Sequence, residues 1–105
     1  GFFMNTLSIT YIFLATLFFS ATPDVKENLY SWQLTFDSFE NCQKFYDQYG
    51  DKLLNGLLDH GKKKYGEEMG IDYLACAMVE IDPQKVMEGT EHPNVMHQLP
   101  VYERN

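Results

Sequence analysis

The chain starts with an apolar segment, and every charged residue lies beyond it. The uncharged run extends from Gly1 to Pro23, with an apolar centre from Leu7 to Phe19. A polar start, an apolar centre and small residues at the end are typical of a signal peptide, and about 20 apolar residues suffice to cross a bilayer as a helix. We therefore predict that residues 1–21 form a signal peptide or a membrane-anchor helix. The alternative is a core helix of a soluble intracellular protein.

A predicted linker over residues 22–29 leads into a segment in which hydrophobic and polar residues alternate strictly. A period of two with aromatic enrichment predicts a β-strand that has one buried and one solvated face. The side chains predicted to share the buried side are those of Tyr30, Trp32, Leu34 and Phe36.

A helix is predicted next, from Ser38 to Tyr65. Asp37 and Glu40 have the spacing of a capping box at its start. Gly66 occupies the position at which a left-handed residue ends a helix. Gly50 is a weak point inside the helix, and we expect a bend there. The residues that form one apolar stripe at steps of three and four are Phe39, Cys42, Phe45, Tyr46, Tyr49, Leu53, Leu57 and His60.

The segment from Ile71 to Ile81 is apolar on both sides, which predicts a strand in the middle of a sheet or under a second layer. Cys76 can reach Cys42 on the helix only if the even-numbered side of this strand faces the helix. We therefore predict that Leu74 and Met78 face the helix too. The odd-numbered side is then free for a partner, and the predicted interaction face consists of Tyr73, Ala75, Ala77 and Val79.

The predicted fold class is α+β. It comprises the N-terminal apolar helix, then a strand, a long amphipathic helix and a second strand in a small domain over residues 30–82. Residues 83–105 are predicted as an irregular tail because prolines interrupt it, with a helical turn over residues 84–88 and a short edge strand over residues 95–99 as its candidates for regular structure.

Net charge narrows the choice of partners. Fifteen acidic and eight basic residues give a net charge of −7. Because nucleic-acid affinity depends on neutralising phosphates, we expect no nucleic-acid partner. The three lysines at 62–64 are consecutive and stand where the predicted helix ends, which suits the negative end of the helix dipole.

The two cysteines indicate the cellular compartment of the protein. An even number of cysteines after an export-like segment predicts one disulfide, between Cys42 and Cys76. Closing a loop of about 35 residues would stabilise the domain by roughly 3–4 kcal/mol. We therefore expect the protein to be periplasmic or extracellular, or anchored with its C-terminal domain outside the cytoplasm.

No residue pattern in the chain has the spacing of a catalytic or metal-binding motif. Asp59 and His60 are adjacent, but no serine in a Gly-x-Ser-x-Gly context accompanies them. His92 and His97 are five residues apart, which matches neither helical nor zinc-finger ligand spacing. We predict no catalytic residue, no metal site and no cofactor.

The function predicted from these features is that of an exported or membrane-tethered, non-enzymatic interaction protein. Its partners would be the membrane or the export machinery through the N-terminal segment, and a protein or a second copy of the chain through the odd-numbered strand face. The alternative is a small secreted enzyme or metal-binding module that uses His60, His92 and His97. No motif is specific enough to name a family.

Overall fold

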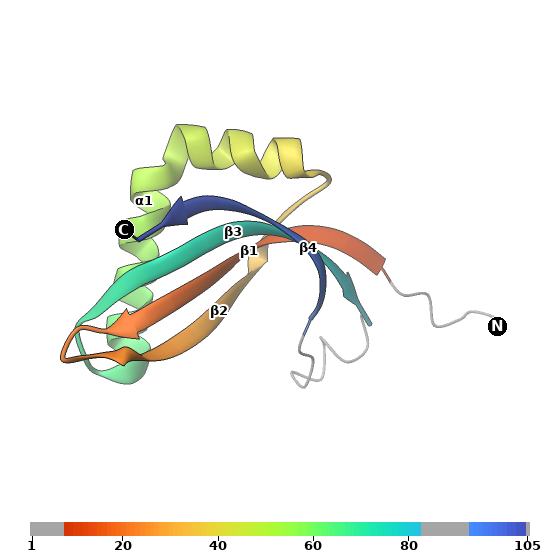
Figure 1. Cartoon of the computed structure of the whole chain (residues 1–105). Coiled ribbons are helices and arrows are strands. Elements are labelled where there is room, and N and C mark those ends of the chain that lie inside the picture. Colours follow the sequence, from red (N-terminus) through yellow and green to blue (C-terminus); the bar gives the residue numbers. More distant parts are fainter. Residues whose placement is uncertain (1–7, 83–92, 105) are drawn as a thin grey trace.

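A computed structural model of the chain describes residues 8–82 and 93–104. It is an α+β fold, as predicted, with one helix and four strands in the described residues. The strands form one sheet in the order β2-β1-β3-β4, and all neighbouring strands are antiparallel. Figure 1 shows the curved sheet and the helix beside it. The elements are β1 (Ser8–Phe19), β2 (Thr22–Phe36), α1 (Phe39–Tyr65), β3 (Met69–Ile81) and β4 (Asn94–Glu103).

The predicted N-terminal apolar helix is not seen, because Ser8–Phe19 form strand β1. This strand pairs with β2 on one side and with β3 on the other. A strand in the centre of a sheet that is covered on both faces needs apolar side chains on both, which explains a long run without charge. Residues 1–7 lie outside the described residues. The buried residues of β1 are Ile12, Phe13, Leu14, Ala15 and Leu17.

Both edge strands of the sheet come from segments that were not predicted as full strands. Residues 22–29, predicted as a linker, form the first half of β2. The prediction of an irregular tail is wrong for Asn94–Glu103, which form β4 and pair with β3, and the short edge strand considered over residues 95–99 lies within β4. Pro100 is tolerated there because β4 is an edge strand, where a missing N–H donor does not break a ladder on both sides. The rest of the predicted tail, residues 83–92, lies outside the described residues.

An irregularity in β2 inverts the alternation of its side chains. Phe13 of β1 stands alone opposite residues 31–34, between the pairs Ile12–Thr35 and Leu14–Tyr30. Three extra residues are an odd number, so the two halves of β2 present opposite faces. The predicted common side is therefore wrong: Tyr30 and Trp32 pack in one apolar cluster, and Leu34 and Phe36 pack in the other.

A smaller irregularity has the same effect in β3. Asp72 has no opposite residue on β1, because Thr16 pairs with Tyr73 and Leu17 pairs with Ile71. One extra residue moves Ile71 to the side of the helix, whereas Tyr73 lies on the other side. Ile71 and Tyr73 thus do not share a face, although their odd numbers predicted that they would.

The sheet separates two apolar clusters. On the helix face, buried side chains pack against helix residues from Phe39 to Tyr65, and this cluster contains Leu74 and Cys76, as predicted. On the opposite face, no residue of α1 takes part in the cluster. The buried core of the helix face is Phe13, Ala15, Leu17, Leu29, Cys42, Met69, Ile71, Leu74 and Cys76, and that of the opposite face is Ile12, Leu14, Ala77 and Val79.

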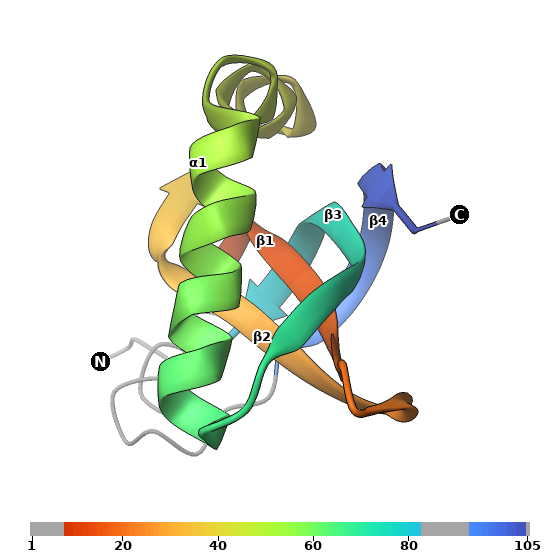
Figure 2. The same cartoon turned by 90° about the vertical axis from the view of Figure 1, so that its left-hand side faces the viewer.

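Helix α1 consists of two straight parts with a bend between them. Its N-cap is Ser38, whose hydroxyl accepts a hydrogen bond from the Asn41 N–H at 3.1 Å, so the predicted cap at Asp37 is off by one residue. Gly66 ends the helix with φ of 73°, as predicted. The backbone leaves helical geometry at Tyr49 (φ −123°, ψ 15°), next to the predicted bend at Gly50. Figure 2 shows the first part nearly end-on and the second part running across the sheet.

Candidate functional site: a pocket between β2 and α1

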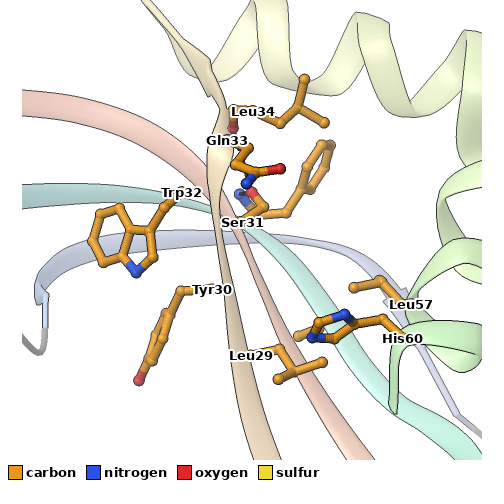
Figure 3. A pocket seen from close by; sticks show the side chains of 10 residues that line it. Leu29, Tyr30, Ser31, Trp32, Gln33, Leu34, Leu57 and His60 are labelled. Atoms are coloured by element: carbon orange, nitrogen blue, oxygen red, sulfur yellow. Dashed lines mark hydrogen bonds between the residues drawn. The ribbon is translucent and has the colours of Figure 1, made fainter. Parts of the chain in front are cut away.

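A pocket with a volume of about 440 Å³ lies between edge strand β2 and the second part of helix α1. Figure 3 shows Leu57 and His60 approaching from the helix, opposite side chains of β2. The side chains of Tyr30 and Trp32 point to the other side of β2 in this view. The volume falls within the range of small-molecule sites, about 300–1,000 Å³. The lining residues are Phe13, Ala15, Leu29, Tyr30, Ser31, Trp32, Gln33, Leu34, Leu57 and His60.

The irregular part of β2 builds one wall of this pocket. Where residues 31–34 lie opposite Phe13 alone, a regular ladder cannot form. The Ser31 hydroxyl replaces it: it accepts a hydrogen bond from the Phe13 N–H at 2.9 Å and donates one to the Leu34 carbonyl at 3.3 Å. A side chain that satisfies backbone groups on both sides holds an irregular segment in one conformation. The wall is therefore preformed.

The pocket has an apolar interior and a polar mouth. Phe13 and Ala15 are each only 1% exposed and form the floor, and Leu29 is buried beside them. Gln33 and His60 are exposed and belong to different elements, β2 and α1. No described residue forms a hydrogen bond or an ion pair with His60. The mouth therefore offers polar groups to a ligand.

The predicted disulfide is present and holds the first part of α1 on the sheet. Cys42 and Cys76 are bonded, with their Cα atoms 6.1 Å apart, and both are completely buried. Phe45, one turn further along the helix, packs against Phe13 and Phe36 with ring centroids 6.0 and 5.5 Å apart. Phe13 is thus shared by the core around the disulfide and the pocket floor, so the two are continuous.

The predicted interaction residues of β3 lie on the opposite face. Ala75, Ala77 and Val79 are each 0% exposed, and Tyr73 is half-buried. The Tyr73 hydroxyl donates a hydrogen bond to Gln98 Oε1 at 2.9 Å, and burial, followed by the charge of Glu103, raises the pKa of Tyr73. The half-buried residues that surround this face are Tyr30, Trp32, Tyr73, Ile81 and Val95.

The three consecutive lysines are all engaged by neighbouring side chains. Lys62 Nζ lies 2.6 Å from a carboxylate oxygen of Glu68, whose hydrogen bond and charge raise the pKa of Lys62. Lys63 pairs with Asp59 at 3.1 Å, and Lys64 lies over the Tyr65 ring. Two of the three positive charges at the helix end are therefore paired with carboxylates.

The histidines considered for metal binding do not form a site within the described residues. No group of three or more histidine, cysteine, aspartate or glutamate side chains is close enough there to hold a metal ion. His60 lies at the pocket mouth on α1, and His97 is exposed on β4. His92 lies outside the described residues.

Sequence reasoning did not find the pocket, although it placed His60 at the end of the apolar helix stripe. The irregular wall over residues 31–34 contains no glycine or proline, the residues that commonly mark a bulge in a sequence. Ser31 looks there like an ordinary solvent-facing residue of an alternating strand. The role of Ser31 becomes visible only in the structure, where its hydroxyl connects the backbone of Phe13 on β1 to that of Leu34 on β2.

Within residues 8–82 and 93–104, no helix has the length and apolarity needed to cross a membrane. Comparisons of the chain with protein-family models, with curated proteins and with solved structures found no match.

Proposed function

We propose that this protein is a non-enzymatic binding protein of an oxidising, extracytoplasmic compartment, and that the pocket between β2 and α1 is its binding site. The observation that carries the proposal is the preformed wall at residues 31–34, which is held open by the Ser31 hydroxyl beside a buried apolar floor. A concave, mostly apolar pocket with a few polar groups at its mouth is the usual form of a small-molecule site.

The buried disulfide supports the location. Disulfides persist in oxidising environments and are rare in the reducing cytosol. The Cys42–Cys76 bond is completely buried and joins the helix to a central strand, so it belongs to the folded core. The proposal of export rests on this disulfide. The apolar segment that was predicted as a signal peptide or anchor helix no longer supports it, because residues 8–19 form a strand of the sheet.

The state of the polar groups favours binding over catalysis at this pocket. The Ser31 hydroxyl already donates to one backbone group and accepts from another. A nucleophilic serine instead needs a base that takes its proton. Ser31 is therefore a structural residue here, and the remaining polar groups, Gln33 and His60, serve as hydrogen-bonding partners.

The sheet edges and the opposite face are weaker candidates for a partner. Edge strand β2 has Pro23 as its second residue and carries Lys26, and edge strand β4 contains Pro100. Prolines, charges and irregular pairing protect edges against the addition of a strand. On the opposite face, Ala77 and Val79 are completely buried, so a protein partner would not reach them.

A fragment screen by NMR tests the binding site. We expect small apolar fragments to shift the backbone amide signals of residues 29–34 and 57–60. Leu57→Trp should fill the pocket and abolish these shifts. Leu58→Trp, which changes another half-buried leucine of α1 outside the pocket lining, should leave them in place.

The outcomes separate a failed proposal from a failed variant. Circular dichroism checks that both tryptophan variants fold, and Leu57→Phe provides a smaller filling residue if Leu57→Trp does not. Equal binding by the filled and control variants, or shifts scattered over the sheet, would contradict the assignment of the pocket. Two free thiols in the natively produced protein would contradict the assignment of the compartment.

A further inference from the structure

We infer that the ligand of this pocket is a small, electrically neutral molecule with an apolar body and one hydrogen-bonding end. Its body would lie on the floor at Phe13 and Leu29, and its polar end would lie at the mouth between His60 and Gln33. This inference rests on the proposed function, because it names the chemistry of the molecule that the same pocket binds.

The size and the interior of the pocket set the apolar body. A volume of about 440 Å³ is at the lower end for small-molecule sites, so a single ring or a short branched group suffices to occupy it. Its deep residues have no polar side-chain atom. The apolar side chains that line it are Phe13, Ala15, Leu29, Leu34 and Leu57.

The side chains around the pocket offer no fixed opposite charge to an ionised ligand. None of the ten residues around the pocket is an aspartate, glutamate, lysine or arginine. Moving a charge from water into an apolar environment without a partner is costly. Asp59, the sequence neighbour of His60, is already paired with Lys63 at 3.1 Å. The net charge of −7 further disfavours an anion.

The mouth supplies the hydrogen bonds. A neutral imidazole and a primary amide each offer one donor group and one acceptor group, so His60 and Gln33 can bind a hydroxyl or a carbonyl. The two residues approach from opposite walls, as Figure 3 shows. Ser31 uses its hydroxyl for the wall itself, and the polar groups of Tyr30 and Trp32 point to the other side of β2. Recognition of the polar end therefore falls to His60 and Gln33.

Four probes of nearly equal size test this inference on the full chain. Toluene is neutral and has no polar end, benzyl alcohol is neutral and has one, benzoate is anionic, and benzylammonium is cationic. Their dissociation constants are measured at pH 7.5 by NMR titration of the amide signals of residues 29–34.

We expect benzyl alcohol to bind about threefold to tenfold more tightly than toluene, the gain of one net hydrogen bond. Benzoate and benzylammonium should bind at least about tenfold more weakly than benzyl alcohol, because neither charge finds a partner. His60→Ala and Gln33→Ala should each reduce the preference for benzyl alcohol over toluene. His97→Ala, which changes an exposed histidine outside the pocket, should leave that preference unchanged.

The outcomes distinguish this inference from the proposed function. If the probes bind at the pocket but benzoate or benzylammonium binds as tightly as benzyl alcohol, the pocket stands and the neutral ligand is wrong. If no probe binds at the pocket, or if Leu57→Trp leaves the binding of the probes unchanged, both are wrong. A dimer in sedimentation that Leu57→Trp dissociates would identify the occupant as a second copy of the chain and overturn the inference of a small molecule.

Discussion

Each face of the sheet buries an apolar cluster, but different elements cover the two clusters. Helix α1 closes one face, where the Cys42–Cys76 bond ties it to β3 and Phe45 packs against Phe13 and Phe36. The opposite face is closed by side chains of the sheet's own strands, among them Tyr30 and Trp32 with ring centroids 6.2 Å apart. The first face depends on a separate element, and the second depends on the curvature and side chains of one sheet.

This difference explains where the pocket forms. A bent helix and a strand with an irregular segment do not match along their whole length, and the space left between them is the cavity next to Leu57 and Ser31. On the opposite face, the small residues Ala77 and Val79 let larger neighbours close over them. A face covered by a separate element is thus the one that can keep a preformed space.

The largest effect is expected from removing the tie between helix and sheet. The double variant Cys42→Ala/Cys76→Ala should lower the free energy of unfolding by about 4 kcal/mol, because it frees a loop of about 35 residues in the unfolded chain. Urea unfolding followed by Trp32 fluorescence measures this loss. A loss below about 1 kcal/mol would show that packing alone holds the helix face.

A pair of core substitutions compares the two faces directly. Leu74 on the helix face and Ile12 on the opposite face are both 0% exposed. Leu74→Ala should cost about 3 kcal/mol, because the helix held by the disulfide cannot move into the space left behind. Ile12→Ala should cost about 2 kcal/mol, because the surrounding side chains can partly fill the space. Equal losses in urea unfolding would mean that the two faces are packed with the same rigidity.

The smallest effect is expected from an ion pair at the end of the opposite face. Lys26 and Arg104, from the two edges of the sheet, lie 2.9 and 3.1 Å from the Asp72 carboxylate, and Arg104 also stacks on the Phe18 ring. The hydrogen bond from Lys26, followed by the charges of both cations, lowers the pKa of Asp72.

The pH dependence of this contribution has a definite sign. A carboxyl group whose pKa is lower in the folded chain stabilises the fold above its unfolded pKa, about 3.9 for aspartate, and the contribution is lost as the pH falls through the folded pKa. The wild type should therefore exceed Asp72→Asn slightly in stability at pH 6, and the difference should vanish in acid. Glu80→Gln, on the same strand, controls for the loss of a charge. A difference that grows in acid would contradict this assignment.

Elements that are defined by a local residue pattern were predicted correctly from the sequence. Elements whose structure depends on the neighbouring strand were not. The helix from Phe39 to Tyr65 and its end at Gly66 follow from spacing alone, whereas the orientation of Cys76 follows from the predicted disulfide. The two central strands have nearly the same pattern, an apolar run on both sides. The run at 71–81 was predicted as a strand because charged residues and turns bound it, and the run at 8–19 as a helix in a membrane because it follows an uncharged terminus. An apolar run of this kind is identified as a central strand by the strands that pair with it, and a single sequence does not show those partners.

The candidate site was less predictable than the fold. His60 was predicted at the end of the apolar helix stripe, but its partner wall on β2 depends on three extra residues opposite Phe13. Strict alternation from Tyr30 to Phe36 predicts a regular strand, because the polarity of the side chains does not show which residues lack a pairing partner on the neighbouring strand. The pocket arises from a register mismatch between two strands, which is a property of the pair.

The number of residues in that mismatch carries a constraint of its own. Deleting one residue from 31–34 would leave an even excess opposite Phe13, so that the parts of β2 before and after it would have to face the same way. Either Tyr30 would turn beneath the helix or Phe36 would turn to the opposite face of the sheet, whatever residue types remained. The number of extra residues in this segment therefore has to stay odd through mutation. This constraint is stronger than any constraint on the identity of a single side chain.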